Sequence, residues 1–400
     1  MKKKYIMWIL SICMVSAMAL PMMSFGDTSE STADNKTTET AAESVEEQTT
    51  DPAVKLEKIS LSLDGVYKQL ENSKTMEVIK LKKQSDQSVA KGYSETASTL
   101  SKLEKSDAVI SGFDSSNKVV AQARRTFANA MLEANNEARI NAMKQEAFQK
   151  YYTLKNTETQ VEIAKESLEL KKSSFETTKR KFQVGSASKS EVENAEKEVK
   201  AAETQLEATK NSLEQLKLSF NSYLGYDISQ EVILTDQIQE IELPETSLSD
   251  AVASALKNRN EIKEAAYNVN ILQLNFNSYK AYPSSSSKYI SAKTQLLNAE
   301  IANQNMPTNI ELDVRAKYDA VMDAYNSIQT GKKTLKSAED ALNTVTRKYN
   351  LGMVTSSEVQ QTKLALNNAK LAQTNALLTY NLAVENYNLS TGVGTTPANL

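Results

Sequence analysis

The sequence contains no histidine, and Cys13 is the only cysteine among its 400 residues. These absences remove the commonest general base, the thiol nucleophile and the preferred ligands of transition metals. Acidic residues are intermingled with lysines, a pattern that favours solvated helix faces over an acid–base pair. A Gly-x-Gly occurs at Gly392-Val393-Gly394, at the end of the chain, where it does not predict a phosphate loop. We therefore expect no enzyme, no metal site and no cofactor.

Helix breakers are also scarce, with only 10 glycines and 6 prolines. None interrupts the stretch from Phe113 to Val184, where each would cost about 1 to 3 kcal/mol. Apolar residues recur there every seven positions, which predicts a long helix with one apolar seam. At 1.5 Å per residue, a helix over most of this stretch is about 100 Å long. The first seam comprises Ala147, Leu154, Val161, Leu168, Phe175 and Phe182; a second comprises Val314, Val321, Ile328, Leu335, Leu342 and Tyr349.

What the sequence does contain is an internal duplication. Lys179 to Ala195 reads KRKFQVGSASKSEVENA, and later in the chain Thr346 to Thr362 reads TRKYNLGMVTSSEVQQT. The register continues without a gap to Gly225 and Gly392. A repeat at a fixed offset predicts two copies of one supersecondary unit.

The centre of each copy has the signals of a tight turn between helices. Gly185 and Gly352 directly follow the last seam residues, where a left-handed helix cap is favoured. Ser188 to Glu191 and Thr355 to Glu358 then match the S/T-x-x-E capping box of a helix start. Each copy is therefore predicted to be an antiparallel helical hairpin, with a left-handed supercoil favoured by the seven-residue repeat.

A shorter amphipathic helix is expected ahead of each hairpin, because Ser62 to Asn72 resembles Ser247 to Asn258 with a one-residue gap. The predicted fold is mainly all-α, with two tandem repeats at 56–243 and 244–400. Between the hairpins, Val232 to Leu234 and Ile238 to Leu243 can add a short strand or two.

The amino terminus indicates export. Lys2 to Lys4 precede an apolar run and then small residues, which predicts a secretory signal peptide over 1–26. A retained membrane anchor is the alternative, since the run is near spanning length, and Cys13 is in a poor context for lipidation. Residues 27–55 are acidic and rich in Ser, Thr and Glu, and Asp27 to Pro52 carries eight acids against Lys36, a net charge of −7. This composition predicts a disordered linker.

The net charge of the whole chain is −3. Once the −7 of Asp27 to Pro52 and the three lysines at Lys2 to Lys4 are set aside, the part from Ala53 onward has a net charge of only +1. It shows no basic stripe interleaved with aromatic residues, and we expect no nucleic-acid partner.

Three features together resemble the TolC family of outer-membrane efflux proteins. They are the paired aromatic-x-[VL]-G-x-x-[ST]-x-x-[DE]-V turns, the Ser-Leu-x-x-Ala-Val-x-x-Ala-Leu-x-Asn segment at Ser247, and Ala281-Tyr282-Pro283. The resemblance covers about Leu56 to Gly392. It implies a homotrimer whose protomers contribute both hairpins to a hollow α-helical barrel. It also implies two partners, a periplasmic adaptor (membrane fusion) protein and an inner-membrane pump of the ABC or RND type. The matching adaptor-docking tip comprises Val184, Gly185, Ser186, Leu351, Gly352 and Met353.

The chain departs from the family pattern in two places. Family members insert a membrane β-hairpin before each long helix, but 102–118 and 282–307 lack strands of alternating polarity and aromatic girdles. We therefore expect a truncated or missing β-barrel, and membrane contact stays open. In the second turn Tyr349 and Glu358 match positions of the family's pore constriction, whereas Val354 and Gln361 do not. Glu358 and Glu191 are also expected to act as capping acids with Thr355 and Ser188.

Two functions remain open at this point. The first is a passive efflux or secretion conduit of the cell envelope, in the outer membrane or periplasm if the cell has two membranes. The second is a structural coiled-coil protein of the envelope that conducts nothing. Small residues on the returning helices, namely Ala195, Ala202, Ala369, Ala376 and Ala383, predict close approach of helices and a homotrimer.

Overall fold

The computed structural model describes residues 57–105 and 116–400, which belong to one compact unit, Lys55–Leu400. The predicted signal peptide, the whole acidic linker and most of the first inserted connection lie outside the described residues. The elements, in chain order, are β1 (Ile59–Leu61), α1 (Leu63–Glu71), α2 (Lys74–Lys105), α3 (Ser116–Gln183), α4 (Lys189–Leu224), β2 (Val232–Leu234), α5 (Leu248–Asn258), α6 (Asn260–Tyr279), α7 (Ser287–Asn350) and α8 (Ser356–Thr391).

The helices form two copies of one series, as the duplication predicts, but each copy has two helices ahead of its hairpin where one was expected. Helices α1 to α4 correspond to α5 to α8, and both series begin with a serine cap. Ser62 Oγ accepts from the backbone N–H of Gly65, and Ser247 Oγ accepts from that of Asp250. The prediction of a mainly helical protein with two tandem hairpins is confirmed.

The two long helices contain 68 residues in α3 and 64 in α7. Helix α7 begins at Ser287, so most of the 282–307 connection is helix and Pro307 lies inside it. Pro307 itself is exposed, whereas Leu296 before it and Ile310 after it in the helix are buried. Packing of these neighbours keeps the helix continuous through a residue that cannot donate a backbone hydrogen bond.

The seam residues are buried in the middle of each hairpin and become exposed toward the turn. Ala147 and Leu154 belong to one apolar core, and their equivalents Val314 and Val321 belong to a second. At the turn end, Phe182 and Tyr349 are exposed. Within one chain, the apolar seam is therefore buried in the middle of each hairpin, and its residues next to the turn remain exposed to solvent.

Strands β1 and β2 form a parallel pair, with Ile59 opposite Val232 and Leu61 opposite Leu234. The expected strand at Val232 to Leu234 is present. The alternative strand at Ile238 to Leu243 is not, because the amide of Asn381 on α8 bonds Gln239 and Ile241 there and holds the chain extended against the helix. The partner strand β1 was not expected from the sequence.

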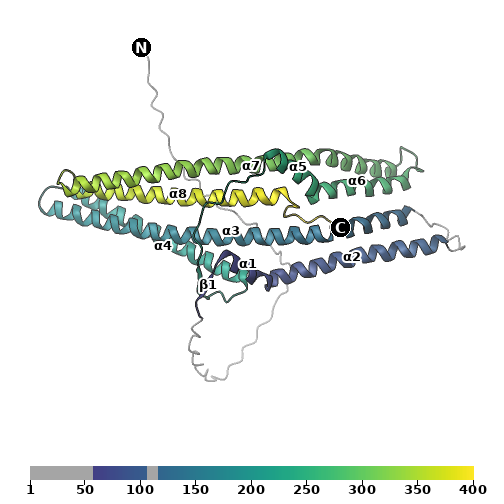
Figure 1. Cartoon of the computed structure of the whole chain (residues 1–400), viewed down its shortest axis with the longest axis horizontal. Helices are drawn as coiled ribbons and strands as arrows, with labels where there is room; N and C mark the ends of the chain where they lie inside the picture. Colours follow the sequence, from purple (N-terminus) through teal and green to yellow (C-terminus); the bar gives the residue numbers. More distant parts are fainter. Residues whose placement is uncertain (1–56, 106–115) are drawn as a thin grey trace, which may run out of the picture. The chain divides into compact units, whose positions relative to one another are not determined.

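The helices lie side by side in a fixed order (Figure 1). Near the turns the order is α4, α3, α8, α7; at the opposite end it is α2, α3, α6, α7. Helix α7 is thus an edge at both ends, and α2 and α4 form the other edge. No helix in the described part of the chain has a stretch long and apolar enough to cross a membrane.

The last residues of the chain hold the two repeats together. The buried amide of Asn135 on α3 donates to the carbonyl of Ala398 (2.9 Å) and accepts from its N–H (2.8 Å). The amide of Asn141, also on α3, donates to Gly394 O (3.1 Å), and that of Asn260 on α6 donates to Thr396 O (3.1 Å). The tail therefore lies between the helices of the two repeats as a hydrogen-bonded clamp.

Candidate functional site: the hairpin tips

The two turns have the same backbone structure. Gly185 and Gly352 have φ of +75° and +72°, in the left-handed region. In the first turn Gly185 N–H donates to Phe182 O (2.9 Å) and Ser186 N–H donates to Lys181 O (2.8 Å). In the second, Gly352 and Met353 donate to Tyr349 O and Lys348 O, both at 2.9 Å. This pair of backbone hydrogen bonds closes the end of a helix and requires a residue that tolerates positive φ.

Around each glycine the chain presents apolar side chains to solvent. Val184 is 78% exposed, Leu351 74% and Met353 70%. A Cβ on Gly185 or Gly352 would meet no atom within 4 Å. The turns therefore form two open apolar knobs, and we call Val184 to Ser186 and Leu351 to Met353 the tips.

The returning helices begin with caps that differ in completeness. In the first turn Ser188 N–H donates to the Glu191 carboxylate (2.6 Å), while Ser188 Oγ accepts from Glu191 N–H (3.2 Å). The Ser188 hydroxyl also donates to the Glu191 carboxylate (2.9 Å). The two bonds to the carboxylate, from the backbone first and then from the hydroxyl, hold the pKa of Glu191 below its ordinary value. In the second turn Thr355 Oγ1 accepts from Glu358 N–H (3.4 Å), and the reciprocal bond is missing from this described segment. The expected capping box is complete at Ser188 and half formed at Thr355.

Charges at the tips complement the helix ends. Arg180 and Lys181 lie in the last turn of α3, and Arg347 and Lys348 lie in the last turn of α7. Cations there are stabilised by the partial negative charge of a helix C-terminus. At both tips, exposed apolar side chains are therefore next to two basic residues of the preceding helix.

A polar seam joins the two hairpins along α3 and α8. Gln360 Nε2 donates to Ser173 Oγ (2.7 Å), and farther from the tips the amide of Asn156 donates to Asn375 (3.0 Å). The two tips therefore lie at the same end of neighbouring hairpins (Figure 1). The sequence signalled each turn but not this lateral pairing.

The close approach of helices expected from the small residues on the returning helices occurs within each hairpin. Ala202 packs against the cluster of Val161, Leu168 and Leu206, and Ala376 and Ala383 pack against the core of the second repeat. Their small size permits close approach of the two helices within one hairpin. Tyr349 and Glu358 are both exposed, so within one chain they line no constriction.

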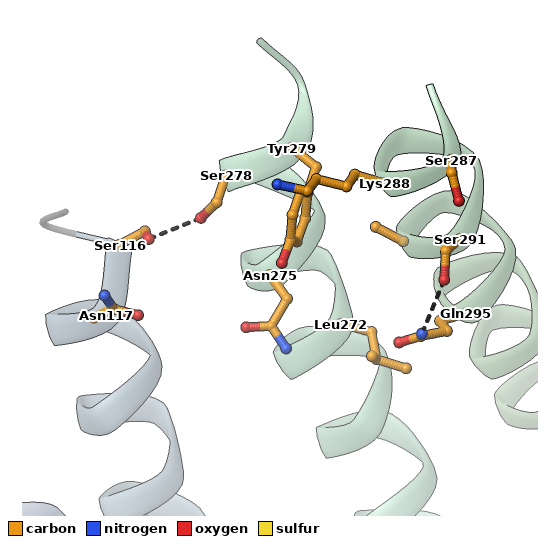
Figure 2. A pocket seen from close by; sticks show the side chains of 11 residues that line it. Ser116, Asn117, Leu272, Asn275, Ser278, Tyr279, Ser287, Lys288, Ser291 and Gln295 are labelled. Atoms are coloured by element: carbon orange, nitrogen blue, oxygen red, sulfur yellow. Dashed lines mark hydrogen bonds between the residues drawn. The ribbon is translucent and has the colours of Figure 1, made fainter. Parts of the chain in front are cut away.

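A second candidate site, not anticipated from the sequence, is a polar pocket of about 590 Å³ at the other end of the hairpins. Its wall comes from α3, α6 and α7 and carries hydroxyl and amide groups around Tyr279 and Lys288 (Figure 2). Ser278 donates to Ser116 across it (2.8 Å). Among the described residues, those that line the pocket carry hydroxyl, amide and ammonium groups and no carboxylate. The described residues contain no group of three or more acidic side chains placed to hold a metal ion.

Comparison with known proteins gives a consistent picture of the fold. No family model and no curated protein matches the chain. Among solved structures, it is similar to the CmeC outer membrane channel of Campylobacter jejuni, with 12% identity and a TM-score of 0.65, over 84% of this chain and 87% of that one.

Two further channels are also similar to it. For the open-state MtrE outer membrane channel of Neisseria gonorrhoeae the identity is 13% and the TM-score 0.63, over 84% and 90% of the two chains. For the outer membrane protein VceC of Vibrio cholerae the values are 15% and 0.54, over 84% and 97%. The chain thus has the fold of the TolC-family outer-membrane channels, as its duplicated turns indicate.

Proposed function

We propose that the chain is one protomer of a passive efflux or secretion conduit in the cell envelope. Three copies complete an α-helical tube, the tips dock a periplasmic adaptor protein, and an ABC- or RND-type pump in the inner membrane drives export. The chain carries out no catalysis in this scheme. Residues 56–243 and 244–400 act as the two repeats of the tube wall, behind a signal peptide and an acidic linker.

The observation that carries this proposal is the pair of matching tips. Two turns far apart in the sequence keep the same left-handed glycine and the same pair of closing bonds, and both expose large apolar side chains. A solvated turn gains nothing from an exposed valine, leucine or methionine, whereas a binding surface does. The fold supports the same conclusion, because the chain spans 87% to 97% of the similar outer-membrane channels described above.

Tyr349 and Glu358 are assigned a role only in the assembled conduit. Three symmetry-related copies would bring three Tyr349 side chains and three Glu358 carboxylates toward one axis. Such a ring would narrow the pore and favour cations, in the manner of other charged rings in channels.

The tips can be tested by placing a photo-crosslinking amino acid at Val184 or Leu351 in the native host. We expect each site to capture an adaptor-class protein with its own helical hairpin, identified by mass spectrometry. The matched control is the same amino acid at Ile228, which is exposed but lies away from the tips. It should not capture that protein.

A functional arm uses the double variant Val184→Glu and Leu351→Glu, which places charges on both knobs without changing the turn glycines. Retention of exported dyes or drugs should rise to the level of a deletion strain. If the tips capture nothing and export is unchanged, the conduit is wrong and the structural coiled-coil alternative is favoured.

A further inference from the structure

The polar pocket at the end of the hairpins continues into a second hollow. The pocket of about 590 Å³ and a neighbouring groove of about 570 Å³ are both lined by Leu272 of α6 and Gln295 of α7. Figure 2 shows these two residues at the end of the pocket that lies away from Ser278 and Ser287. Pocket and groove therefore form one elongated site along α6 and α7, which we call the α6–α7 site.

The polar end of the α6–α7 site has one positive charge with no carboxylate beside it. Figure 2 shows the Lys288 side chain reaching from α7 across the pocket toward Tyr279 of α6. Its Nζ lies 5.2 Å from the centroid of the Tyr282 ring, and it forms no ion pair with a described residue. Asn275 and Ser291 line the pocket with amide and hydroxyl groups. These groups offer hydrogen bonds but leave the ammonium charge without a counterion.

The sequence around the pocket adds positive charge without acids. From Ala265 to Ala299 the chain has three lysines, namely Lys280, Lys288 and Lys293, and no aspartate or glutamate. In the whole chain acids outnumber bases, 50 to 47. Such a local excess of positive charge favours an anionic ligand. Lysine binds phosphate as a point charge, whereas bidentate recognition of carboxylates favours arginine, and no arginine is among the described residues that line the pocket.

The groove that continues from the pocket carries apolar side chains. They are Ala265, Leu272, Ala299, Ala302 and Met306. From Gln295 to Met306 the axis of α7 advances about 16 Å, at 1.5 Å per residue. The hydrocarbon of one bilayer leaflet is about 15 Å thick, half of the whole core. The groove therefore has the length of one acyl chain.

Two carboxylates line the far end of the groove, and both already have partners. Glu261 accepts from Arg259 (2.6 Å), and Glu264 accepts from the amide of Asn399 (2.7 Å). Glu264 is fifteen residues before Tyr279 on α6, which corresponds to about 22 Å along the helix. Salt screens exposed charges beyond about 8 to 10 Å. These carboxylates therefore do not repel an anion bound at the polar end.

We infer that the α6–α7 site binds one anionic phospholipid, with its phosphate at Lys288 and one acyl chain along the groove. The amide and hydroxyl groups of the pocket hydrogen-bond the headgroup oxygens, and Ala299 and Met306 cover the acyl chain. A polar headgroup alone would leave the apolar groove open to water, and an apolar ligand alone would leave Lys288 without a counterion. An amphiphile satisfies both ends of the site. This ligand is additional to the proposed conduit and does not depend on it.

Phosphatidylglycerol is the probe for this site, added to the full-length chain in a mild non-ionic detergent. We expect native mass spectrometry to detect one bound lipid per chain. The apolar run near the amino terminus can bind lipid independently, so a second measurement must locate the lipid. Hydrogen exchange in peptides from 268–306 should slow when phosphatidylglycerol is added, and exchange in peptides from α4 should not change.

Four variants test the two ends of the site. Lys288→Gln removes the charge but keeps a hydrogen-bonding side chain, so it should weaken binding at least about tenfold. Its control is Lys293→Gln, whose Nζ lies 5.3 Å from the Phe276 ring outside the pocket; binding should change by no more than about twofold. Ala302→Glu places a carboxylate in the groove and should also weaken binding at least about tenfold, whereas Ala316→Glu, exposed on α7 outside the groove, should not. None of these four side chains is buried, so all variants should keep the wild-type helix content in circular dichroism.

Probes that lack one part of the ligand complete the test. Glycerol phosphate has a headgroup without chains, and phosphatidylcholine has chains with a zwitterionic headgroup. Both should slow exchange in 268–306 less than phosphatidylglycerol does. An equal effect of phosphatidylcholine would overturn the role of Lys288, and an equal effect of glycerol phosphate would reduce the site to a phosphate pocket and overturn the lipid. No slowing with phosphatidylglycerol, or unchanged binding in Lys288→Gln, would also overturn the inference and would leave the conduit untouched.

Discussion

The carboxyl-terminal clamp gives the sharpest quantitative prediction. Asn135 is fully buried, and its amide makes both of its bonds to the backbone of Ala398, at 2.9 and 2.8 Å. Asn135→Ala removes both bonds and leaves the N–H and C=O of Ala398 without a partner. Each unpaired buried group costs about 1 to 3 kcal/mol, so local opening of the tail should become easier by at least about 2 kcal/mol.

Hydrogen exchange measures this opening directly. The N–H of Ala398 donates to Asn135, so its exchange rate reports the free energy of breaking the clamp. A change of at least about 2 kcal/mol predicts exchange at least about 30-fold faster. The amides in the middle of α4, far from the tail in the order of helices, should keep their protection.

Asn399→Ala is the matched control. Asn399 is exposed and makes one side-chain bond, from its Nδ2 to Glu264 (2.7 Å). Its loss should change the Ala398 rate by no more than about twofold, since exposed polar contacts contribute little. Equal rates in Asn135→Ala and wild type would refute the argument that the tail is held by this buried amide.

Three further predictions concern the tips and the hairpin cores. Gly352→Ala should lower the melting temperature by about 1 to 3 °C through backbone strain alone. Gly92→Ala, inside α2 and with no atom within 4 Å of the added Cβ, should raise it slightly. A decrease for both would refute the assignment to φ. The cap bonds lower the pKa of Glu191, so the cap should be intact above about pH 4.5. It should be lost as the pH falls through that lowered pKa. The hydrogen-exchange rate of the Ser188 amide, measured from pH 6 to 3, reports this loss. Burial raises the pKa of Glu385, so Glu385→Gln should stabilise the chain at pH 7, and this gain should vanish below pH 4; a gain independent of pH would contradict it.

Local features of this fold could be predicted from the sequence because they depend on neighbours within a few residues. The seven-residue seams, the absence of breakers before Val184 and the two glycine turns predict the hairpins, and the structure has them. The tips are predictable for the same reason, since Gly185 and Gly352 adopt the left-handed conformation that their position after a helix requires. The constant offset between the two copies then predicts that the second hairpin repeats the first.

Contacts between distant segments could not be predicted in this way. Strand β1 exists because Ile59 to Leu61 meets Val232 to Leu234, and nothing local distinguishes it from a loop. Helix α7 continues through Pro307 because buried neighbours on both sides hold it, although propensity predicts a break.

Tertiary packing also decided which small and aliphatic side chains are covered within the chain and which remain exposed. Ala376 and Ala383 have the small size expected at an interface between copies, yet α7 covers them within the hairpin. The faces that remain open, with Leu81 on α2 and Leu297 on α7, look in the sequence like ordinary helix surface. The order of the helices alone places these two faces at opposite edges, because which long helix lies beside which depends on pairings between segments far apart in the sequence.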